Sequence, residues 1–460
     1  MNNDTRAFLI VPGLALKTGR RYIVAIRSLV HEDGSAVQPS EAFAALRDGT
    51  ATSDPDVEER RALFEDIFGI LGANGVSRSN LIQAWDFTVA SEYNLVHRQF
   101  DVLEDALARM PETGPEYRIF EITDDTNANI ARRIIGLMSI PLYMTSPGPG
   151  STLVLDENDR PVFQKFTWIK FTVLIPRSAV DTGVPAAVMQ YGHGLLGGQG
   201  EVEGGYLSEI ANKYNYILAA CDWQGMSAED APFVIEMMLR DIGSFNIIPE
   251  RLTQGVLNSV LLMKVLTGPF MSDAAMTYNG KSVVDPTQRY YHGNSQGGIF
   301  GHNYLALSPW VNRGVLGVPG GPYNVLLARS VDFTPFFVLI KSRFPASFDQ
   351  IFLLGFMGQL WDRSEPAGYL NYLNNNEEKQ LLFQYGIGDA QVSYLGAYGC
   401  MRSVNAAIFE NNVVEATEKL YGFDVVSGSV ANRSVGVGFK YHGVPDVRFL
   451  FAYFMCFLCV

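Results

Sequence analysis

The chain has 460 residues, of which 47% are hydrophobic and 18% charged, and its formal net charge is −13. This composition supplies the apolar material for a large core, and the length suits two domains or one enlarged catalytic domain. The acidic balance argues against nucleic acid and against an anionic membrane as partners, since both are bound through faces rich in lysine and arginine.

The first 115 residues predict an N-terminal module of strands and helices, which we expect to be incomplete at its start. Residues 8–50 are expected to be strands, the clearest being the β-branched and aromatic run at 21–26. Residues 56–110 have helical spacing, with a second helix over 98–110 and a strand at 84–90 in between. The chain does not begin with the basic start and long apolar run of a secretory signal.

Residues 116–446 predict an α/β domain. Residues 117–180 favour strands, and from about residue 185 strands and helices alternate. Strands are predicted at 186–191, 216–221, 289–291, 314–318 and 380–385, and helices at 204–214 and 249–266. Such alternation predicts a mostly parallel sheet with helices on both faces. The aromatic, helically spaced stretch 324–378 is expected to be a helical cap over an active site, or else a set of core helices.

A G-x-S-x-G motif occurs at residues 293–297 as Gly-Asn-Ser-Gln-Gly, after a strand-like segment and before a helix-compatible one. In this pattern a tight strand-to-helix turn exposes the serine hydroxyl, and the glycines let neighbouring backbone pass without a Cβ clash. The motif therefore predicts Ser295 as a nucleophile. A plain glycine turn is the alternative, because the pattern is weak on its own.

An upstream glycine-rich loop at 193–198, His-Gly-Leu-Leu-Gly-Gly, follows the predicted strand at 186–191. Loops of the H-G-x-x-G type can point backbone N–H groups at an oxyanion. We expect the donors to be the N–H groups of Leu195 and of Gln296, the residue after the serine. His193 and Gly194 are expected to support the loop, with His193 as an anchor rather than a base. A glycine turn that binds no ligand is the alternative.

The acid and the base of a catalytic triad are expected downstream of Ser295. Asp389 follows the predicted strand at 380–385 and has the place of the acid in the chain order Ser, Asp, His. Its alternative role is a helix N-cap. Of the two histidines after the serine, His302 lies two turns along the predicted helix. His442 is therefore the expected base, unless the chain lacks one.

With these motifs in this order, the chain resembles the α/β-hydrolase superfamily. More narrowly, it resembles a group of large bacterial, exported hydrolase-like proteins with a β-rich N-terminal extension. The matching stretches are 19–25, 84–88, 192–197, 221–226, 293–298 and 388–392, and the resemblance spans about residues 9–446. It implies that Ser295 is the nucleophile, Asp389 the acid and the loop at 193–198 the oxyanion site, in a protein of the cell envelope or exterior.

Residues 447–460 form an apolar tail that is too short for a membrane span of about 20 residues. We expect this tail to be aberrant, because the resemblance implies a further histidine-bearing stretch after residue 445. Cys456 and Cys459 in the tail form a C-x-x-C pair without a second pair or a βαβ context, so no metal or redox site is expected.

Together these features predict a serine hydrolase that cleaves carboxylic esters with Ser295, Asp389 and His442, without a cofactor or metal. The expected partner is a small-molecule ester, with neither nucleic acid nor a stable membrane span. Two alternatives stay open. One is another serine-dependent acyl-transfer enzyme, such as a peptidase or acyltransferase, and the other is a non-catalytic binding protein with the same fold.

Overall fold

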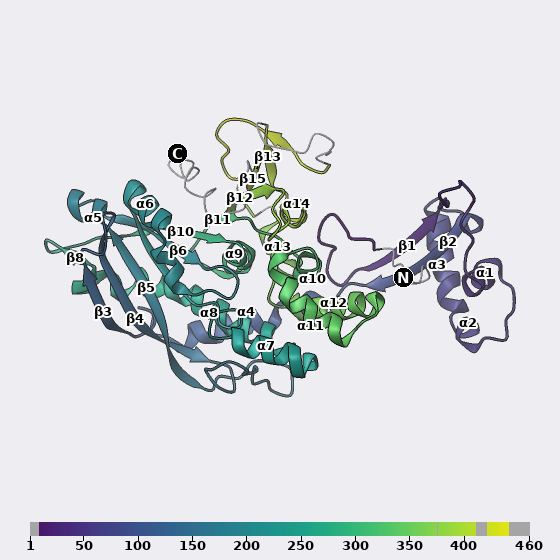
Figure 1. Cartoon of the computed structure of the whole chain (residues 1–460), viewed down its shortest axis with the longest axis horizontal. Helices are drawn as coiled ribbons and strands as arrows, with labels where there is room; N and C mark the ends of the chain where they lie inside the picture. The colour runs from purple at the N-terminus through teal and green to yellow at the C-terminus, as the bar shows by residue number, and fades with distance from the viewer. Residues whose placement is uncertain (1–8, 375, 411–420, 441–460) are drawn as a thin grey trace. The chain divides into compact units, whose positions relative to one another are not determined.

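The computed structural model describes residues 9–374, 376–410 and 421–440. The chain divides into two compact units, one formed by Met1–Ala15 with Leu95–Val460 and the other by Leu16–Asn94. Figure 1 labels the elements of both. The module predicted for residues 1–115 stays a prediction; the compact unit found within it ends at Asn94.

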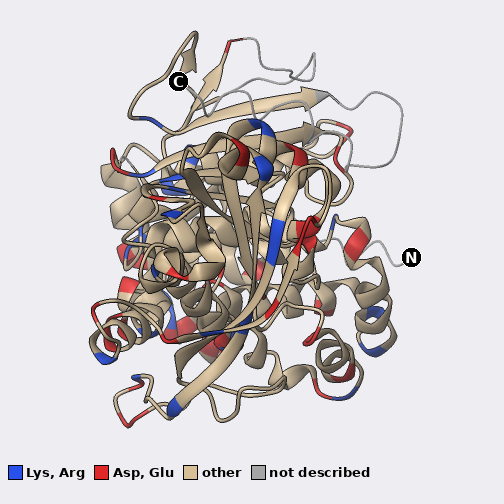
Figure 2. Ribbon diagram, turned by 90° about the vertical axis from the view of Figure 1, so that its left-hand side faces the viewer, with Lys and Arg blue, Asp and Glu red and all other residues tan. Residues whose placement is uncertain are grey.

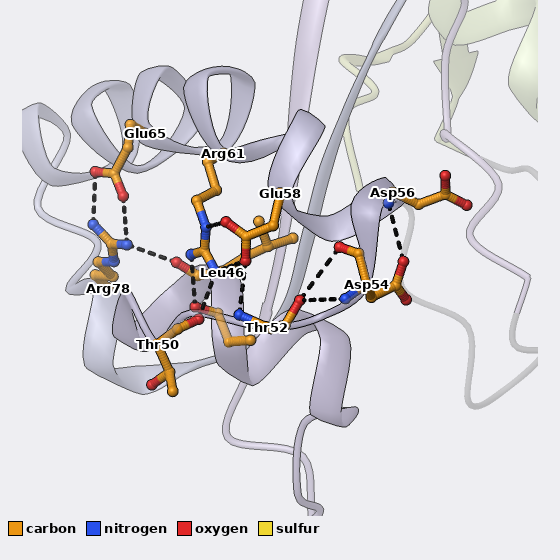
Figure 3. Close-up of polar contacts among 10 residues, drawn as sticks. Leu46, Thr50, Thr52, Asp54, Asp56, Glu58, Arg61, Glu65 and Arg78 are labelled. Carbon is orange, nitrogen blue, oxygen red and sulfur yellow. Dashed lines mark hydrogen bonds and ion pairs between the residues drawn. The ribbon is translucent and has the colours of Figure 1, made fainter.

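The unit Leu16–Asn94 combines a two-stranded antiparallel sheet with three α-helices. The strands are β1 (Arg21–Arg27) and β2 (Leu81–Thr88), and the helices are α1 (Glu41–Asp48), α2 (Pro55–Glu59) and α3 (Arg61–Ala73). Its core is small and consists of Phe43, Ile67, Phe68, Leu71, Leu81 and Ala84. Around this core, Arg61 pairs with Glu58 at 2.6 Å and Arg78 with Glu65 at 2.6 Å, and both arginines also donate to backbone carbonyls (Figure 3).

The expectation that residues 8–50 are all strands is wrong over α1. The hydroxyl of Ser40 accepts a hydrogen bond from the Phe43 N–H at 3.2 Å and so caps the start of this helix. Gly49 ends the helix in the left-handed conformation, with φ 70°. Serine before a helix and glycine after it are both boundary signals. Caps at both ends therefore stabilise a helix inside a segment whose other residues favour strands.

The larger unit is built on an 11-stranded sheet with the order β14-β13-β15-β12-β11-β10-β6-β7-β5-β4-β3. Neighbours from β14 to β7 pair in parallel, and β5, β4 and β3 pair antiparallel at one side. The bounds are β3 (Tyr117–Asp124), β4 (Ile130–Leu142), β5 (Lys165–Pro176), β6 (Ala186–Gly192), β7 (Tyr216–Cys221), β10 (Val284–Asn294), β11 (Arg313–Gly317), β12 (Gln380–Ile387), β13 (Ala407–Phe409), β14 (Val425–Val426) and β15 (Val435–Lys440). The predicted mostly parallel sheet is confirmed.

Helices cover both faces of this sheet. Outside the stretch between β11 and β12, the described α-helices are α4 (Glu92–Arg109), α5 (Arg177–Thr182), α6 (Gly205–Tyr214), α7 (Ala231–Arg240), α8 (Ile247–Leu266), α9 (Gln296–Leu307) and α14 (Tyr394–Ser403). In β6, Ala187 and Met189 pack in the cluster of α6, whereas Ala186 and Val188 pack in the cluster of α8 and α9. Because both faces of the central strands are buried, these strands read as continuous apolar runs.

Helix α8 is a core helix. It lies within Ile242–Ser272, the segment of the described residues that is long and apolar enough to cross a membrane. However, 17 of its 20 residues are buried inside the protein, on all sides of the helix.

Lysine and arginine are interspersed with aspartate and glutamate over the described chain (Figure 2).

The stretch between β11 and β12 is helical, as predicted for 324–378. It forms α10 (Tyr323–Leu327), α11 (Thr334–Arg343), α12 (Ser347–Trp361) and α13 (Pro366–Leu373) (Figure 1). Trp361 stacks on Tyr323 with ring centroids 4.4 Å apart, and α13 packs against α9. At least part of this stretch therefore belongs to the core beside the α9 helix.

Candidate active site

Ser295 occupies the turn between β10 and α9, with φ 53° and ψ −120°. Residues with a side chain rarely adopt this backbone region, which costs about 1–3 kcal/mol. Hydrogen bonds hold the turn: the Ser295 N–H donates to the Gly317 carbonyl of β11 at 2.9 Å, and the Ile299 N–H donates to the Ser295 carbonyl at 2.9 Å. This strand–turn–helix arrangement around Ser295, called the elbow, is the geometry that the G-x-S-x-G pattern requires.

The glycines around Ser295 allow three backbone segments to approach closely. A Cβ on Gly297 would overlap the carbonyl of Gly192 at the end of β6, and a Cβ on Gly293 would overlap the carbonyl of Gly297. A Cβ on Gly298 would overlap the carbonyl of Gly317. Among these residues the need for glycine comes from this close approach, since φ is not positive at any of them.

Ser295 lines a cavity of about 560 Å³. Its other walls are Tyr191, Gly194, Gly200, Glu201, Glu203, Gly204, Tyr206, Asn294, Val318, Asp389, Gln391 and Val392. Among the described residues, three carboxylates and no lysine, arginine or histidine line this cavity. The wall residues also include none from α10 to α13 within the described chain, so the role of 324–378 as a cap stays a prediction.

Asp389 lies in the same cavity as Ser295, in the turn after β12. Its Oδ1 accepts hydrogen bonds from the N–H groups of Gln391 at 2.8 Å and Val392 at 3.0 Å. Burial raises the pKa of this carboxyl, and the two N–H donors oppose that rise. Asp389 is not the N-cap of the following helix α14, because that position is occupied by Ser393.

The glycine-rich loop after β6 contacts the elbow through Gln296. The side-chain Nε2 of Gln296 donates to the Gly194 carbonyl at 3.2 Å and to the Met226 carbonyl at 2.9 Å. Within the described chain, the backbone N–H groups of Leu195 and Gln296 have no acceptor. Gln296 is also the first residue of helix α9, and the first N–H groups of a helix carry partial positive charge. Neither Leu195 nor Gln296 is among the described residues that line the cavity of Ser295, so their role as oxyanion donors stays a prediction.

His193 anchors the loop after β6 to the segment after β7. Its Nε2 accepts a hydrogen bond from the Trp223 N–H at 2.8 Å, so its Nδ1 carries the proton and donates to the Gly194 carbonyl at 2.9 Å. Desolvation by burial lowers the pKa of this imidazole. Both ring nitrogens of His193 are therefore occupied, and neither is left to act as a base.

Two further histidines on the elements of the elbow are buried in the core. Burial lowers the pKa of His292 in β10 to about 4 and that of His302 in α9 to about 4. The Nδ1 of His302 donates to the Ile299 carbonyl at 2.9 Å, and its ring packs against Phe383. Neither lines the cavity of Ser295 in the part of the chain that the structure describes.

The expected base, His442, lies outside the described residues. The strand that leads to it is described: β15 pairs in parallel with β12, and Lys440 is the partner of Ile387. His442 follows Lys440 by two positions in the sequence, as Asp389 follows Ile387.

In the described residues, no group of three or more His, Cys, Asp or Glu side chains could hold a metal ion. Cys221 and Cys400 are buried free thiols. Cys456 and Cys459 lie outside the described residues.

Sequence reasoning missed two polar features of the cavity wall. Glu201, in the 3-10 helix at Gln199–Glu203, accepts a hydrogen bond from the Gly194 N–H at 2.8 Å. The side-chain Nδ2 of Asn294 donates to the Tyr206 hydroxyl at 2.7 Å. Asn294 lies inside the motif and could have been singled out, whereas nothing in the local sequence distinguishes Glu201 from the nearby Glu203.

No protein-family model and no curated protein matches the chain. Among solved structures, it is similar to acetyl xylan esterase 1 from a Thermoanaerobacterium species, with 12% identity, a TM-score of 0.41, and coverage of 77% of this chain and 92% of that one. An acetyl xylan esterase from a Paenibacillus species gives 12% identity, a TM-score of 0.40 and coverage of 75% and 89%. An S-formylglutathione hydrolase from Agrobacterium tumefaciens gives 11% identity, a TM-score of 0.35 and coverage of 74% and 95%.

Proposed function

We propose that the protein is a serine hydrolase that cleaves small carboxylic esters. The observation that carries this proposal is the position of Ser295: it lies on a strained elbow and shares one cavity with Asp389 and with the glycine loop at Gly194. A nucleophile and an acid that line one cavity, with N–H donors on the adjoining loop and turn, are the parts that acyl transfer to water needs.

In the proposed reaction, His442 takes the proton of the Ser295 hydroxyl while Oγ attacks the ester carbonyl carbon. The N–H groups of Leu195 and Gln296 hold the oxyanion that forms. The tetrahedral intermediate then collapses, the bond to the alcohol oxygen breaks, and His442 returns the proton to the leaving alcohol. Water attacks the acyl-enzyme in the same manner and releases the carboxylic acid. Asp389 orients the imidazole and stabilises its charged form.

The test is Ser295-dependent chemistry of the full chain. A fluorophosphonate probe should label the wild-type protein and p-nitrophenyl esters should be hydrolysed, and Ser295→Ala should abolish both. Ser342→Ala changes an exposed serine of α11 and should leave labelling and hydrolysis as they are. Amide substrates in the same assay separate an esterase from a peptidase.

A non-catalytic binding protein with the same fold is the alternative. Folded wild-type protein that neither reacts with the probe nor hydrolyses any ester would overturn the esterase proposal in favour of this one. The narrower resemblance to exported bacterial hydrolase-like proteins also remains part of the proposal.

A further inference from the structure

Gly194 is held by hydrogen bonds on both of its sides. Its N–H donates to Oε2 of Glu201 at 2.8 Å. Its carbonyl accepts from Nδ1 of His193 at 2.9 Å, from Nε2 of Gln296 at 3.2 Å and from the Gly197 N–H at 3.1 Å. Glycine has the freest backbone of all residues, so a defined conformation here depends on partners for the peptide before it and the peptide after it.

The direction of the Leu195 N–H follows from these contacts. A trans peptide is planar, and its N–H points opposite to its carbonyl. Donors from His193, Gln296 and Gly197 hold the Gly194 carbonyl, so the Leu195 N–H of the same peptide points away from them. The peptide before Gly194 carries the Gly194 N–H. Among the described residues, the hydrogen bond to Glu201 is the one that holds this N–H.

The loop is shaped around the carboxylate of Glu201. Oε1 of Glu201 lies where a Cβ of residue 197 would be, so the carboxylate can take this position because residue 197 is glycine. Leu196, between the two glycines, has φ 47°, a left-handed value that leucine rarely adopts. The turn at 194–197 therefore relies on the contacts it makes and not on the preference of its residues.

A carboxylate at this place has an electrostatic disadvantage for ester cleavage. Glu201 lines the cavity of Ser295, where negative charge develops on the substrate oxygen, and like charges repel. A role in geometry accounts for its presence, because its side-chain oxygen accepts the hydrogen bond from the Gly194 N–H.

We propose that Glu201 is a positioning residue, which fixes Gly194 and thereby aims the Leu195 N–H at the oxyanion. This inference rests on the proposed function of Ser295. Glu201 acts as a hydrogen-bond acceptor in this role, so its charge is dispensable and its oxygen is not. If Glu201 instead bound a cationic group of the substrate, its negative charge would be required. Removing this charge in Glu201→Gln would then lower activity.

Three variants separate these roles. Glu201→Gln keeps an oxygen acceptor and removes the charge, and Glu201→Leu removes both. Glu209→Leu is the control, because Glu209 is an exposed glutamate of α6 and is not among the described residues that line the cavity. The readouts are kcat and KM for p-nitrophenyl acetate and the inhibition constant of a trifluoromethyl ketone, which forms a tetrahedral oxyanion on the serine.

Glu201→Leu should lower kcat by about 10- to 100-fold, less than the loss of a whole oxyanion donor, and should leave KM nearly unchanged. Binding of the trifluoromethyl ketone should weaken by a similar factor. Glu201→Gln and Glu209→Leu should stay within a few-fold of wild type. An unchanged kcat in Glu201→Leu, or an equal loss in Glu201→Gln, overturns the proposal.

Hydrogen exchange of the peptide covering residues 193–198 tests the same contact without activity. Exchange should be faster in Glu201→Leu than in wild type, Glu201→Gln and Glu209→Leu, and equal exchange in all four overturns the proposal. Should Glu201→Leu fail to fold, Gln296→Met tests the clamp from the carbonyl side, with a similar loss of kcat expected. Absence of Ser295-dependent hydrolysis in the wild type refutes the proposed function alone, and the exchange experiment still decides the role of Glu201.

Discussion

Ile387 of β12 and Lys440 of β15 are partners in one parallel ladder. Two positions after Ile387 the chain reaches Asp389, in the cavity of Ser295, and two positions after Lys440 the sequence has His442. Neighbouring parallel strands end at the same edge of a sheet, and in open α/β sheets ligands bind outside this carboxyl edge. The register of β12 and β15 is therefore the basis for keeping His442 as the proposed base.

Replacement of His442 by alanine should lower kcat for p-nitrophenyl esters by at least about 10⁴-fold, because the Ser295 hydroxyl would lose its proton acceptor. His31→Ala changes an exposed histidine of the unit Leu16–Asn94 and serves as the control. Steady-state kinetics measures both. Full activity in His442→Ala would assign the base to another residue.

Gly297→Ala should destabilise the elbow, because the new Cβ would overlap the carbonyl of Gly192 and neither backbone segment can yield. Overpacking of this kind costs about 1–3 kcal/mol or more, and labelling of Ser295 by a fluorophosphonate should be lost with it. Gly205→Ala, at the start of α6, has open space around its Cβ and should keep wild-type stability and labelling. Thermal unfolding that is the same for Gly297→Ala and wild type would refute the close-packing argument.

The buried ion pair of Asp230 and Arg251, 2.5 Å apart, supports the segment after β7. Asp230 also accepts from the N–H groups of Gly225 and Ser227, so removing either charged partner leaves buried groups unpaired. Asp230→Ala should cost about 3–5 kcal/mol of unfolding free energy, measured in urea. The double variant with Arg251→Met should cost less than the sum of the two single changes.

An ion pair on the surface is the control for this double-mutant cycle of Asp230 and Arg251. Arg240 and Glu236 lie 3.4 Å apart on α7 with exposed side chains, and Glu236→Ala should leave the unfolding free energy unchanged. Additive losses in the Asp230 and Arg251 cycle would mean that the two charges do not depend on each other.

His302 should make the protein less stable in acid. Its folded-state pKa of about 4 lies below the ordinary value of about 6.5, so between these pH values the unfolded chain binds a proton that the folded chain does not. Its contribution is therefore fully present above about pH 6.5 and is lost as the pH falls toward 4, by up to about 3 kcal/mol. His302→Leu should reduce the pH dependence of urea unfolding by that amount. Parallel pH curves for variant and wild type would contradict this assignment.

The central part of the fold and the elbow could be predicted because their signals are local. The signal for β6 is an apolar run, which follows from burial of both faces of the central strands. The signal for the elbow is the set of glycines around Ser295. Each signal lies within a few consecutive residues. The pairing direction of β3, β4 and β5 had no such signal. Residues 117–180 favour strands in any sheet, and only the path of the chain makes these three antiparallel.

Among the helices that were not predicted, α7 and α1 carry helical signals of different strength. In α7, Val234, Met237 and Met238 are buried while Ile235 and Leu239 are exposed, so its apolar residues do not follow one clear stripe. In α1, the caps at Ser40 and Gly49 were the better signal than composition. Glu201 could not be predicted as part of the site, because its partner, the Gly194 N–H, becomes a neighbour only when the loop has folded.

The pairing of β10 with β6 has a consequence for how the chain reaches its native state. Val284 pairs with Ala186, which lies roughly one hundred residues earlier in the chain. Contacts between such distant segments form slowly, because the entropy of closing a long loop must be overcome before they stabilise anything. On dilution from denaturant, the far-ultraviolet signal of the helices should therefore return before the serine becomes reactive toward a fluorophosphonate.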